Sequence, residues 1–220
     1  MALRSVQIPA LTTTNVPVLS TLQINVLLSD QVVALETRQI VVLTTIQVPA
    51  ITTDDIVAIS TVQVQSLTTI QIPVLTTAQI IVLTTAQTYT LLTSQIVVIT
   101  TIQIPAITTI AILTLSTDQI VSVLTSQAVA LTTAQIVALL TTQVSSLLTS
   151  QAEVLLTTQV DVLLTAQTYV LNSTHEGLPI TVLTSFAAGI PTVATNAPGT
   201  NEVIFHEKTG LLVEPGNTED

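Results

Sequence analysis

The side chains that could take part in chemistry are concentrated near the end of the chain. All five glycines, both histidines, both phenylalanines and the only lysine lie at or after His175. In this part, Glu176-Gly177-Leu178-Pro179 predicts a turn that opens a helix, because proline suits the first helical position. The N–H groups near Gly177 and Leu178 would then lie at a helix N-terminus, which is a natural site for an anion. The helix dipole alone also favours a Glu at this place, without any binding role.

Short secondary-structure elements must hold this turn in place. We expect a strand at 169–172, a helix at 180–188 that ends at Gly189, a strand at 191–195 and a third strand at 209–214. A strand, a helix and a second strand with short connections predict a right-handed parallel unit. Residues 168–220 are therefore expected to form a partial α/β, Rossmann-like unit.

The same residues carry a family resemblance. Glu-Gly-x-Pro, a helix ending in Ala-Ala-Gly, then Pro-x-Val-Ala-Thr, Gly-x-x-Glu and Gly-Leu-Leu-Val-x-Pro-Gly follow one another over about 50 residues. This stretch resembles the donor-binding end of GT-B glycosyltransferases of the retaining family 4 type. The matching positions are Ser173, Glu176, Gly177, Pro179, Ala187, Ala188, Gly189, Pro191, Val193, Ala194, Thr195, Gly199, Glu202, Gly210, Leu211 and Gly216.

The resemblance implies a site for a nucleotide sugar. Glu176 matches the first member of a Glu-x7-Glu pair, which touches the donor sugar, and the ribose-binding second member falls at Thr184. The amides of Gly177 and Leu178 would face the phosphates. A hydroxyl at Thr184 lacks the charge-assisted strength of a carboxylate. The resemblance also places phosphate-neutralising Arg and Lys residues upstream, where this chain has a repeat, and the acceptor-binding half is absent. We therefore expect a glycosyltransferase-derived chain that keeps part of the donor site without full transferase activity, and we assign no catalytic residue.

Composition excludes other classes of function. The chain has no cysteine, and His175 and His206 lack the further ligands that a zinc site needs, so we expect no metal and no cofactor. A net charge of −10 argues against nucleic acid and anionic membrane surfaces as partners. We see no apolar segment of about 20 residues that would span a membrane and no secretory signal. The expected location is cytoplasmic.

Residues 1–167 follow an eight-residue repeat. Gln occupies 18 of the 21 positions from 7 to 167 in steps of eight, the exceptions being Asn15, Asp55 and Ala111. Four residues before each of these positions stands Leu, Ile or Val. A continuous helix would rotate each octad by about 80° relative to the last, so no apolar stripe would persist. The fixed period instead predicts a solenoid.

Two solenoid architectures fit the octad, beside the possibility of no stable fold. We prefer a β-solenoid-like stack, because Thr, Val and Ile suit strands and an even period keeps Leu and Ile on the inside. Gln and Thr would form ladders between coils or tile the solvent face. A solenoid of short helices is the alternative, since Thr-Thr-Ala-Gln matches a capping box. Prolines inside the helix count against that alternative: Pro9, Pro17, Pro49, Pro73 and Pro105.

The repeat itself predicts no chemistry, because no His or Lys lies near its many hydroxyls. It could serve as a structural or adhesive protein that self-associates through the repeat. A third hypothesis is a reading frame in which a 24-nucleotide repeat is joined to the end of a transferase gene. We expect the boundary between the two parts to lie between about Gln167 and Asn172.

Overall fold

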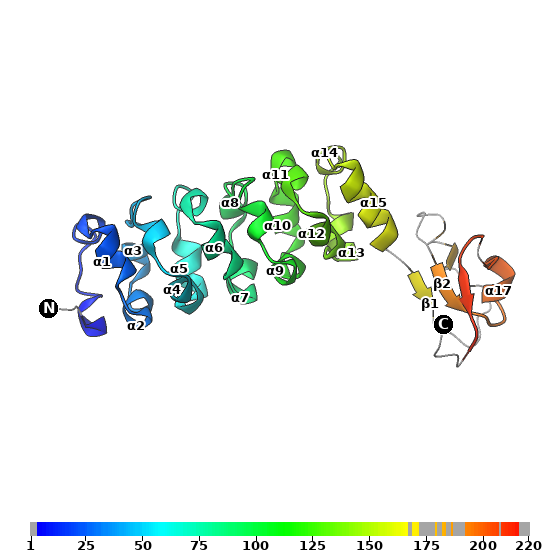
Figure 1. The fold of residues 1–220 in the computed structure, drawn as a ribbon, viewed down its shortest axis with the longest axis horizontal. Coiled ribbons are helices and arrows are strands. Elements are labelled where there is room, and N and C mark those ends of the chain that lie inside the picture. Colours follow the sequence, from blue (N-terminus) through cyan, green and yellow to red (C-terminus); the bar gives the residue numbers. More distant parts are fainter. Residues whose placement is uncertain are drawn as a thin grey trace. The chain divides into compact units, whose positions relative to one another are not determined.

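A computed structural model of the chain describes residues 4–166, 169–171, 179, 182–183, 186, 192–206 and 208–215. Contacts divide the chain into two compact units, Met1–Leu155 and Leu156–Asp220, called here the repeat unit and the C-terminal unit (Figure 1). Residues 167 and 168 lie outside the described part, so the predicted domain boundary after Gln167 stays a prediction.

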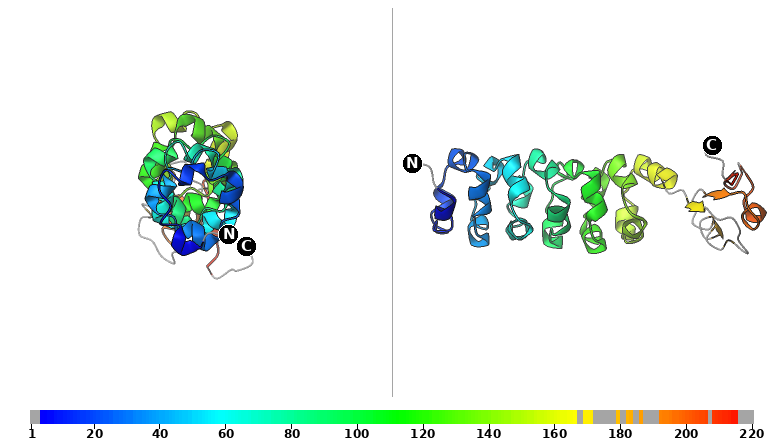
Figure 2. Two further views of the ribbon diagram at one scale, coloured as in Figure 1. Left: turned by 90° about the vertical axis from the view of Figure 1, so that its left-hand side faces the viewer. Right: turned by 90° about the horizontal axis from the view of Figure 1, so that it is seen from below.

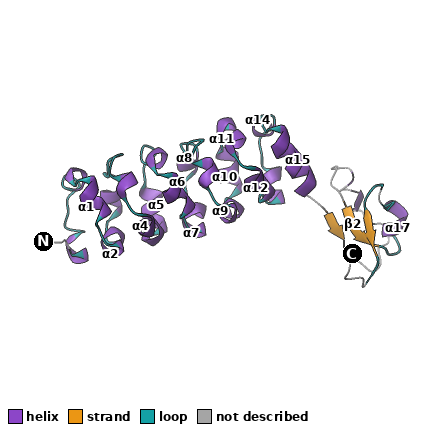
Figure 3. Cartoon of the chain, in the orientation of Figure 1, coloured by secondary structure: helices purple, strands orange, loops and turns teal. Residues whose placement is uncertain are grey.

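The repeat unit is built from short helices, one in each octad, and the preferred β-solenoid prediction is wrong. All strands that the structure describes lie in the C-terminal unit (Figure 3). Looking along the repeat unit, the helices surround a common interior (Figure 2). The α-helices are α1 Thr21–Asn25, α2 Ser29–Val33, α3 Thr37–Ile40, α4 Thr53–Ala58, α5 Thr61–Ser66, α6 Thr77–Ile81, α7 Thr85–Tyr89, α8 Thr93–Ile96, α9 Thr109–Thr114, α10 Thr117–Ser122, α11 Thr125–Ala130, α12 Thr133–Val137, α13 Thr141–Ser145 and α14 Thr149–Ala152. The 3-10 helices are η1 Ser5–Gln7, η2 Val16–Val18, η3 Val48–Ala50, η4 Ile72–Val74 and η5 Ile104–Ala106.

The octad from Leu75 to Val82 shows why each unit folds into one helical turn. We number its residues 1 to 8, so that the buried Leu75 is position 1 and Gln79 is position 5. Thr76, at position 2, has extended backbone, and its side-chain oxygen accepts a hydrogen bond from the Gln79 N–H at 3.1 Å. In return, Gln79 Oε1 accepts from the Thr76 N–H at 2.8 Å. This capping box satisfies donors that a short helix would otherwise leave unpaired.

The prolines are accommodated because the octads that contain them avoid an α-helix. In four octads the chain makes a turn followed by a 3-10 helix whose second residue is proline, at Pro17, Pro49, Pro73 and Pro105. Around Pro49, the Val48 N–H still donates to Thr44 O at 3.1 Å and the Ala50 N–H donates to Gln47 O at 3.0 Å. The large cost of proline applies to a helix interior. A helix of one turn has no interior, so this objection to short helices fails.

The repeated glutamine fastens each turn of the solenoid to the previous one. Gln79 Nε2 donates to Val48 O at 2.9 Å and to Ile51 O at 2.7 Å, 31 and 28 residues earlier in the chain. One turn of the solenoid therefore takes between three and four octads. The same pair of bonds is made by Gln39, Gln47, Gln63, Gln71, Gln87, Gln95, Gln103, Gln119, Gln127, Gln135, Gln143 and Gln151. These side chains are buried, so the expectation that glutamine tiles the solvent face is wrong.

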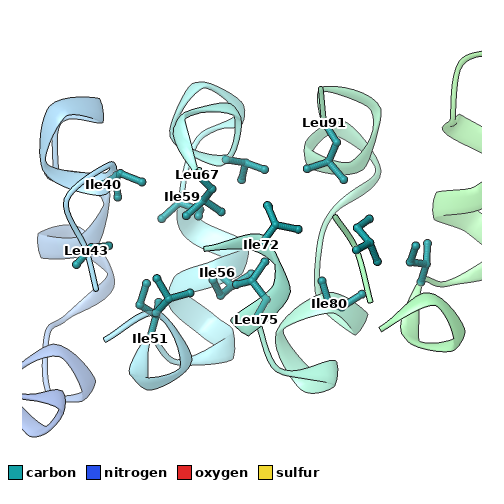
Figure 4. Close-up of a cluster of buried hydrophobic side chains, with 14 of the residues drawn as sticks. Ile40, Leu43, Ile51, Ile56, Ile59, Leu67, Ile72, Leu75, Ile80 and Leu91 are labelled. Atoms are coloured by element: carbon teal, nitrogen blue, oxygen red, sulfur yellow. The ribbon is translucent and has the colours of Figure 1, made fainter. Parts of the chain in front are cut away.

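Aliphatic side chains fill the interior of the repeat unit. Position 1 supplies residues such as Leu67, Leu75 and Leu91, and position 6 supplies residues such as Ile72 and Ile80, all buried. Figure 4 shows these side chains pointing into the interior from the short helices and from the links that join them. The Leu and Ile positions of the octad face inward together, as the fixed phase of the repeat predicts.

The C-terminal unit begins with helix α15, Thr157–Ala166, and contains a small parallel sheet. Strands β1 Tyr169–Leu171, β2 Thr192–Thr195 and β3 Leu211–Val213 lie in the order β1-β2-β3 and pair in parallel. Val193 pairs with Val170 on one side and with Leu211 on the other. Helix α17, Thr200–Val203, lies between β2 and β3 in sequence. The three strands lie within the three segments predicted from sequence, and their parallel pairing is the described part of the α/β unit. The predicted helix at 180–188 lies largely outside the described residues.

Candidate functional site

The residues predicted to bind the donor lie outside the described part of the chain. This applies to Glu176, Gly177, Leu178 and Thr184, and also to His175. Their segment nevertheless has a defined starting point, because it follows Leu171 at the carboxyl end of β1. Ligands of parallel α/β sheets bind outside the carboxyl ends of the strands. The described part of the candidate site therefore lies along that edge of the sheet.

A buried threonine organises the connection that leaves β2. The Thr200 hydroxyl oxygen lies 2.6 Å from Thr195 O and 2.8 Å from Ala197 O, and it accepts a hydrogen bond from the Ala197 N–H at 3.2 Å. Thr200 is fully buried. Gly199, just before α17, has φ 90°, a backbone conformation that glycine adopts without strain. The turn between β2 and α17 is thus fixed by its own hydrogen bonds.

The connection after β2 leads into α17, whose first helical turn contains the motif residue Glu202. Glu202 is exposed, so its carboxylate is accessible to solvent. The turn follows β2 at the same edge of the sheet from which the Glu176 segment leaves β1. The segment that contains Glu176 therefore follows β1, the segment that contains Glu202 follows β2, and these two strands are neighbours in the sheet.

The carboxyl ends of β2 and β3 are tied together beside this turn. The Asn196 N–H donates to Val213 O at 2.7 Å, and Asn196 Nδ2 donates to Glu214 Oε1 at 2.7 Å. His206 stabilises the connection to β3, because its Nδ1 accepts a hydrogen bond from the Leu212 N–H at 3.0 Å. Asn196 and Thr200 were not singled out from sequence. The signal available was the turn-forming run from Asn196 to Gly199, which predicts a tight connection that side chains must stabilise.

Gly210 allows a close approach inside this unit. A Cβ atom added at Gly210 would lie 2.6 Å from Thr192 O and 3.1 Å from Ile204 Cγ2. Only glycine fits there, which gives a physical reason for this motif position. Among the described residues, no three His, Asp or Glu side chains gather as a metal site would require. Within the same part of the chain, no helix has the length and apolar character needed to cross a membrane.

Comparisons with known proteins match one family in the repeat and another in the C-terminal part of the chain. Residues 148–220 match the family described as Glycosyl transferases group 1, and residues 48–85 match the ALTTAQ repeat. A protein of Haemophilus influenzae described as an uncharacterized glycosyltransferase is 42% identical over 53 residues, which cover 24% of this chain and 15% of that protein. The chain thus spans a small part of that relative's length. No solved structure matches. The chain joins an ALTTAQ-type repeat to a C-terminal segment similar to glycosyl transferases group 1.

Proposed function

We propose that the C-terminal unit is the donor-side part of a glycosyltransferase and binds a nucleotide sugar. The family match at residues 148–220 carries this proposal. In the proposed site, Glu176 contacts the sugar, the amides of Gly177 and Leu178 face the phosphates, and Thr184 lies at the ribose. The described sheet supports this arrangement, since the segment holding Glu176 leaves the carboxyl end of β1.

The chain alone is proposed to bind weakly and not to transfer sugar. Transfer from a nucleotide sugar needs positive charge on the departing phosphates, and Lys208 is the only Lys or Arg after Arg38. A helix N-terminus contributes about 0.3–1 kcal/mol to an exposed anion. Micromolar affinity requires roughly 8 kcal/mol. The acceptor-binding half and the missing basic residues would have to supply the difference.

Titration with a panel of nucleotide diphosphate sugars tests the proposal. Calorimetry of the 220-residue chain should show binding weaker than micromolar for at least one member. Glu176→Gln should weaken it, and Thr184→Glu should strengthen it by restoring the carboxylate at the ribose. A matched control is Glu153→Gln in the exposed surface of the repeat unit, which should change nothing. Equal binding by wild type and Glu176→Gln would refute the assigned site, and rapid turnover would refute the claim of inactivity.

A second candidate function is self-association through the repeat unit. The observation that favours it is the exposure of large apolar side chains at position 4 of several octads. Ile46, Ile70 and Ile102 are 72%, 70% and 76% exposed, and exposed apolar side chains can mark interaction surfaces. Sedimentation velocity should then show concentration-dependent dimers that the triple replacement of these residues by Thr removes. A monomer at all concentrations would exclude this role.

A further inference from the structure

The most constant feature of the octad outside its core is a hydroxyl at position 3. In all 21 octads this residue is Ser or Thr, from Ser5 to Thr165. Other positions have diverged between copies of the repeat. Position 5 departs from Gln three times, and position 2 lacks a hydroxyl in nine octads, at Arg4, Leu28, Glu36, Leu92, Leu124, Leu140, Leu148, Leu156 and Leu164. Recent duplication alone would have left position 2 as uniform as position 3.

Folding does not explain the hydroxyl at position 3. In the octad with α6, Thr76 at position 2 caps the helix, whereas Thr77 is merely its first residue. Across the described octads from Thr13 to Thr157, the position-3 hydroxyl makes a hydrogen bond at Ser29, which donates to Asp55, and at no other octad. Threonine is also a poor helix former. Pro, Asp or Glu would suit the first helical turn better.

The position-3 side chains are placed for contact with another molecule. Thr77, Thr85, Thr93, Thr101 and their equivalents from Thr109 to Thr157 are all exposed. Most of them are the first helical residue after an extended link, as Thr77 is in α6, whereas Thr101 lies in the turn before η5. Helices three octads apart are in contact, as α4 is with α6. From Thr77 to Thr157 the hydroxyls therefore form columns along the outside of the repeat unit, exposed and without a hydrogen bond within the fold.

The charge of the chain favours a neutral group as the partner of these hydroxyls. The net charge is −10, and the described part of the repeat unit contains two cationic side chains, Arg4 and Arg38. Phosphate on many of the hydroxyls would add about −1.5 to −2 charges at each one. A neutral sugar adds none and increases the polar surface over exposed apolar residues. The same chain carries a segment similar to glycosyl transferases group 1.

We propose that the position-3 hydroxyls are sites of O-glycosylation, with a nucleotide diphosphate sugar as the co-reactant. The threonine oxygen forms a bond to the anomeric carbon of the sugar, and the bond from that carbon to the phosphate oxygen breaks. The nucleoside diphosphate leaves with the electron pair, and the hydroxyl proton passes to a base of the catalysing transferase. The choice of a sugar as the group rests on the function proposed above. The position of the modification rests on the structure of the octad alone.

Mass spectrometry of the full chain purified from the cells that produce it tests this proposal. The intact mass should exceed the sequence mass by several glycosyl increments. Fragmentation that preserves O-linked groups should place them at position 3, on Thr77 and not on the neighbouring Thr76. Thr76 and Thr77 are adjacent, both exposed and chemically identical, so an octad with a hydroxyl at both positions contains its own control. An unmodified mass, phosphate increments, or equal occupancy of positions 2 and 3 would overturn the proposal.

Paired variants produced in the same cells separate modification from folding. Replacing Thr77, Thr85, Thr93 and Thr101 by Ala should remove the glycans of these four octads and leave the helical circular dichroism unchanged. Replacing the capping Thr76 and Thr84 by Ala should lower stability and leave the glycan number unchanged. The opposite pattern would contradict the proposal. Titration of the unmodified chain with nucleotide sugars tests the donor site independently. Glycans at position 3 without nucleotide-sugar binding would refute the proposed function and leave this inference intact.

Discussion

Replacing a single buried glutamine should remove hydrogen bonds between two successive turns of the solenoid and lower the free energy of unfolding. The Gln79 side chain makes three hydrogen bonds, with the Thr76 N–H and with the carbonyl oxygens of Val48 and Ile51, at 2.7 to 2.9 Å. Gln79→Met keeps an unbranched side chain of similar size and removes all three. Each bond contributes about 0.5–1.5 kcal/mol, and its loss leaves buried groups unpaired. We therefore expect a loss of roughly 2–4 kcal/mol in the free energy of unfolding.

Urea denaturation followed by far-UV circular dichroism measures this loss, with Gln65→Met as the matched control. Gln65 is exposed and its Nε2 makes one bond, to Thr90 O at 2.9 Å. The control should shift the midpoint only slightly, because a solvent-exposed bond is readily replaced by water. Solenoids often unfold in parts, so the earliest helical transition is the quantity compared. Equal midpoints for the two variants would refute the view that glutamine fastens the turns.

Three further changes probe the capping box, the glutamine pattern and the C-terminal sheet. Thr76→Ala should lose about 0.5–2 kcal/mol of stability as a lost N-cap, whereas Thr77→Ala should be neutral or slightly stabilising; equal effects in urea denaturation would contradict these roles. Ala111→Gln should raise the stability of the repeat unit by about 1 kcal/mol by restoring the missing fastening bonds, and a lower midpoint would show that the turns cannot accept the side chain there. Gly210→Ala should destabilise the C-terminal unit, since its Cβ would lie 2.6 Å from Thr192 O; proteolysis should then cleave that unit first, and unchanged resistance would contradict the close packing.

The period of the repeat predicts its solenoid character and its inward-facing residues, because burial requires a fixed phase. It does not select helix over strand. The weak helix propensities of Thr, Val and Ile favour strands locally, and hydrogen bonds to residues 28 and 31 positions away outweigh that preference. Hydrogen bonds between residues this far apart cannot be predicted from the secondary-structure propensities of a single octad. The sequence pattern predicts that Pro49 breaks a helix, yet Pro49 is the second residue of a 3-10 helix, where its missing N–H costs little.

In the C-terminal unit, local signals sufficed for the strands. The apolar runs at Tyr169–Leu171, Thr192–Thr195 and Leu211–Val213 are bounded by turn residues, and all three pair in parallel. The hydrogen bonds of Thr200 and Asn196 could not be predicted, because they depend on how the turn after β2 folds back on the sheet. Glu176 and Thr184 remain predictions that rest on the family resemblance.

Hydrogen–deuterium exchange with millimolar nucleotide diphosphate sugar tests most directly whether the C-terminal unit is a donor site. Binding should slow exchange in peptides that cover 172–185 and the turn from Thr195 to Val203. The amides of the repeat unit serve as the internal reference and should exchange at unchanged rates. Protection confined to the repeat unit, or no protection with any sugar nucleotide of the panel, would contradict the proposed function.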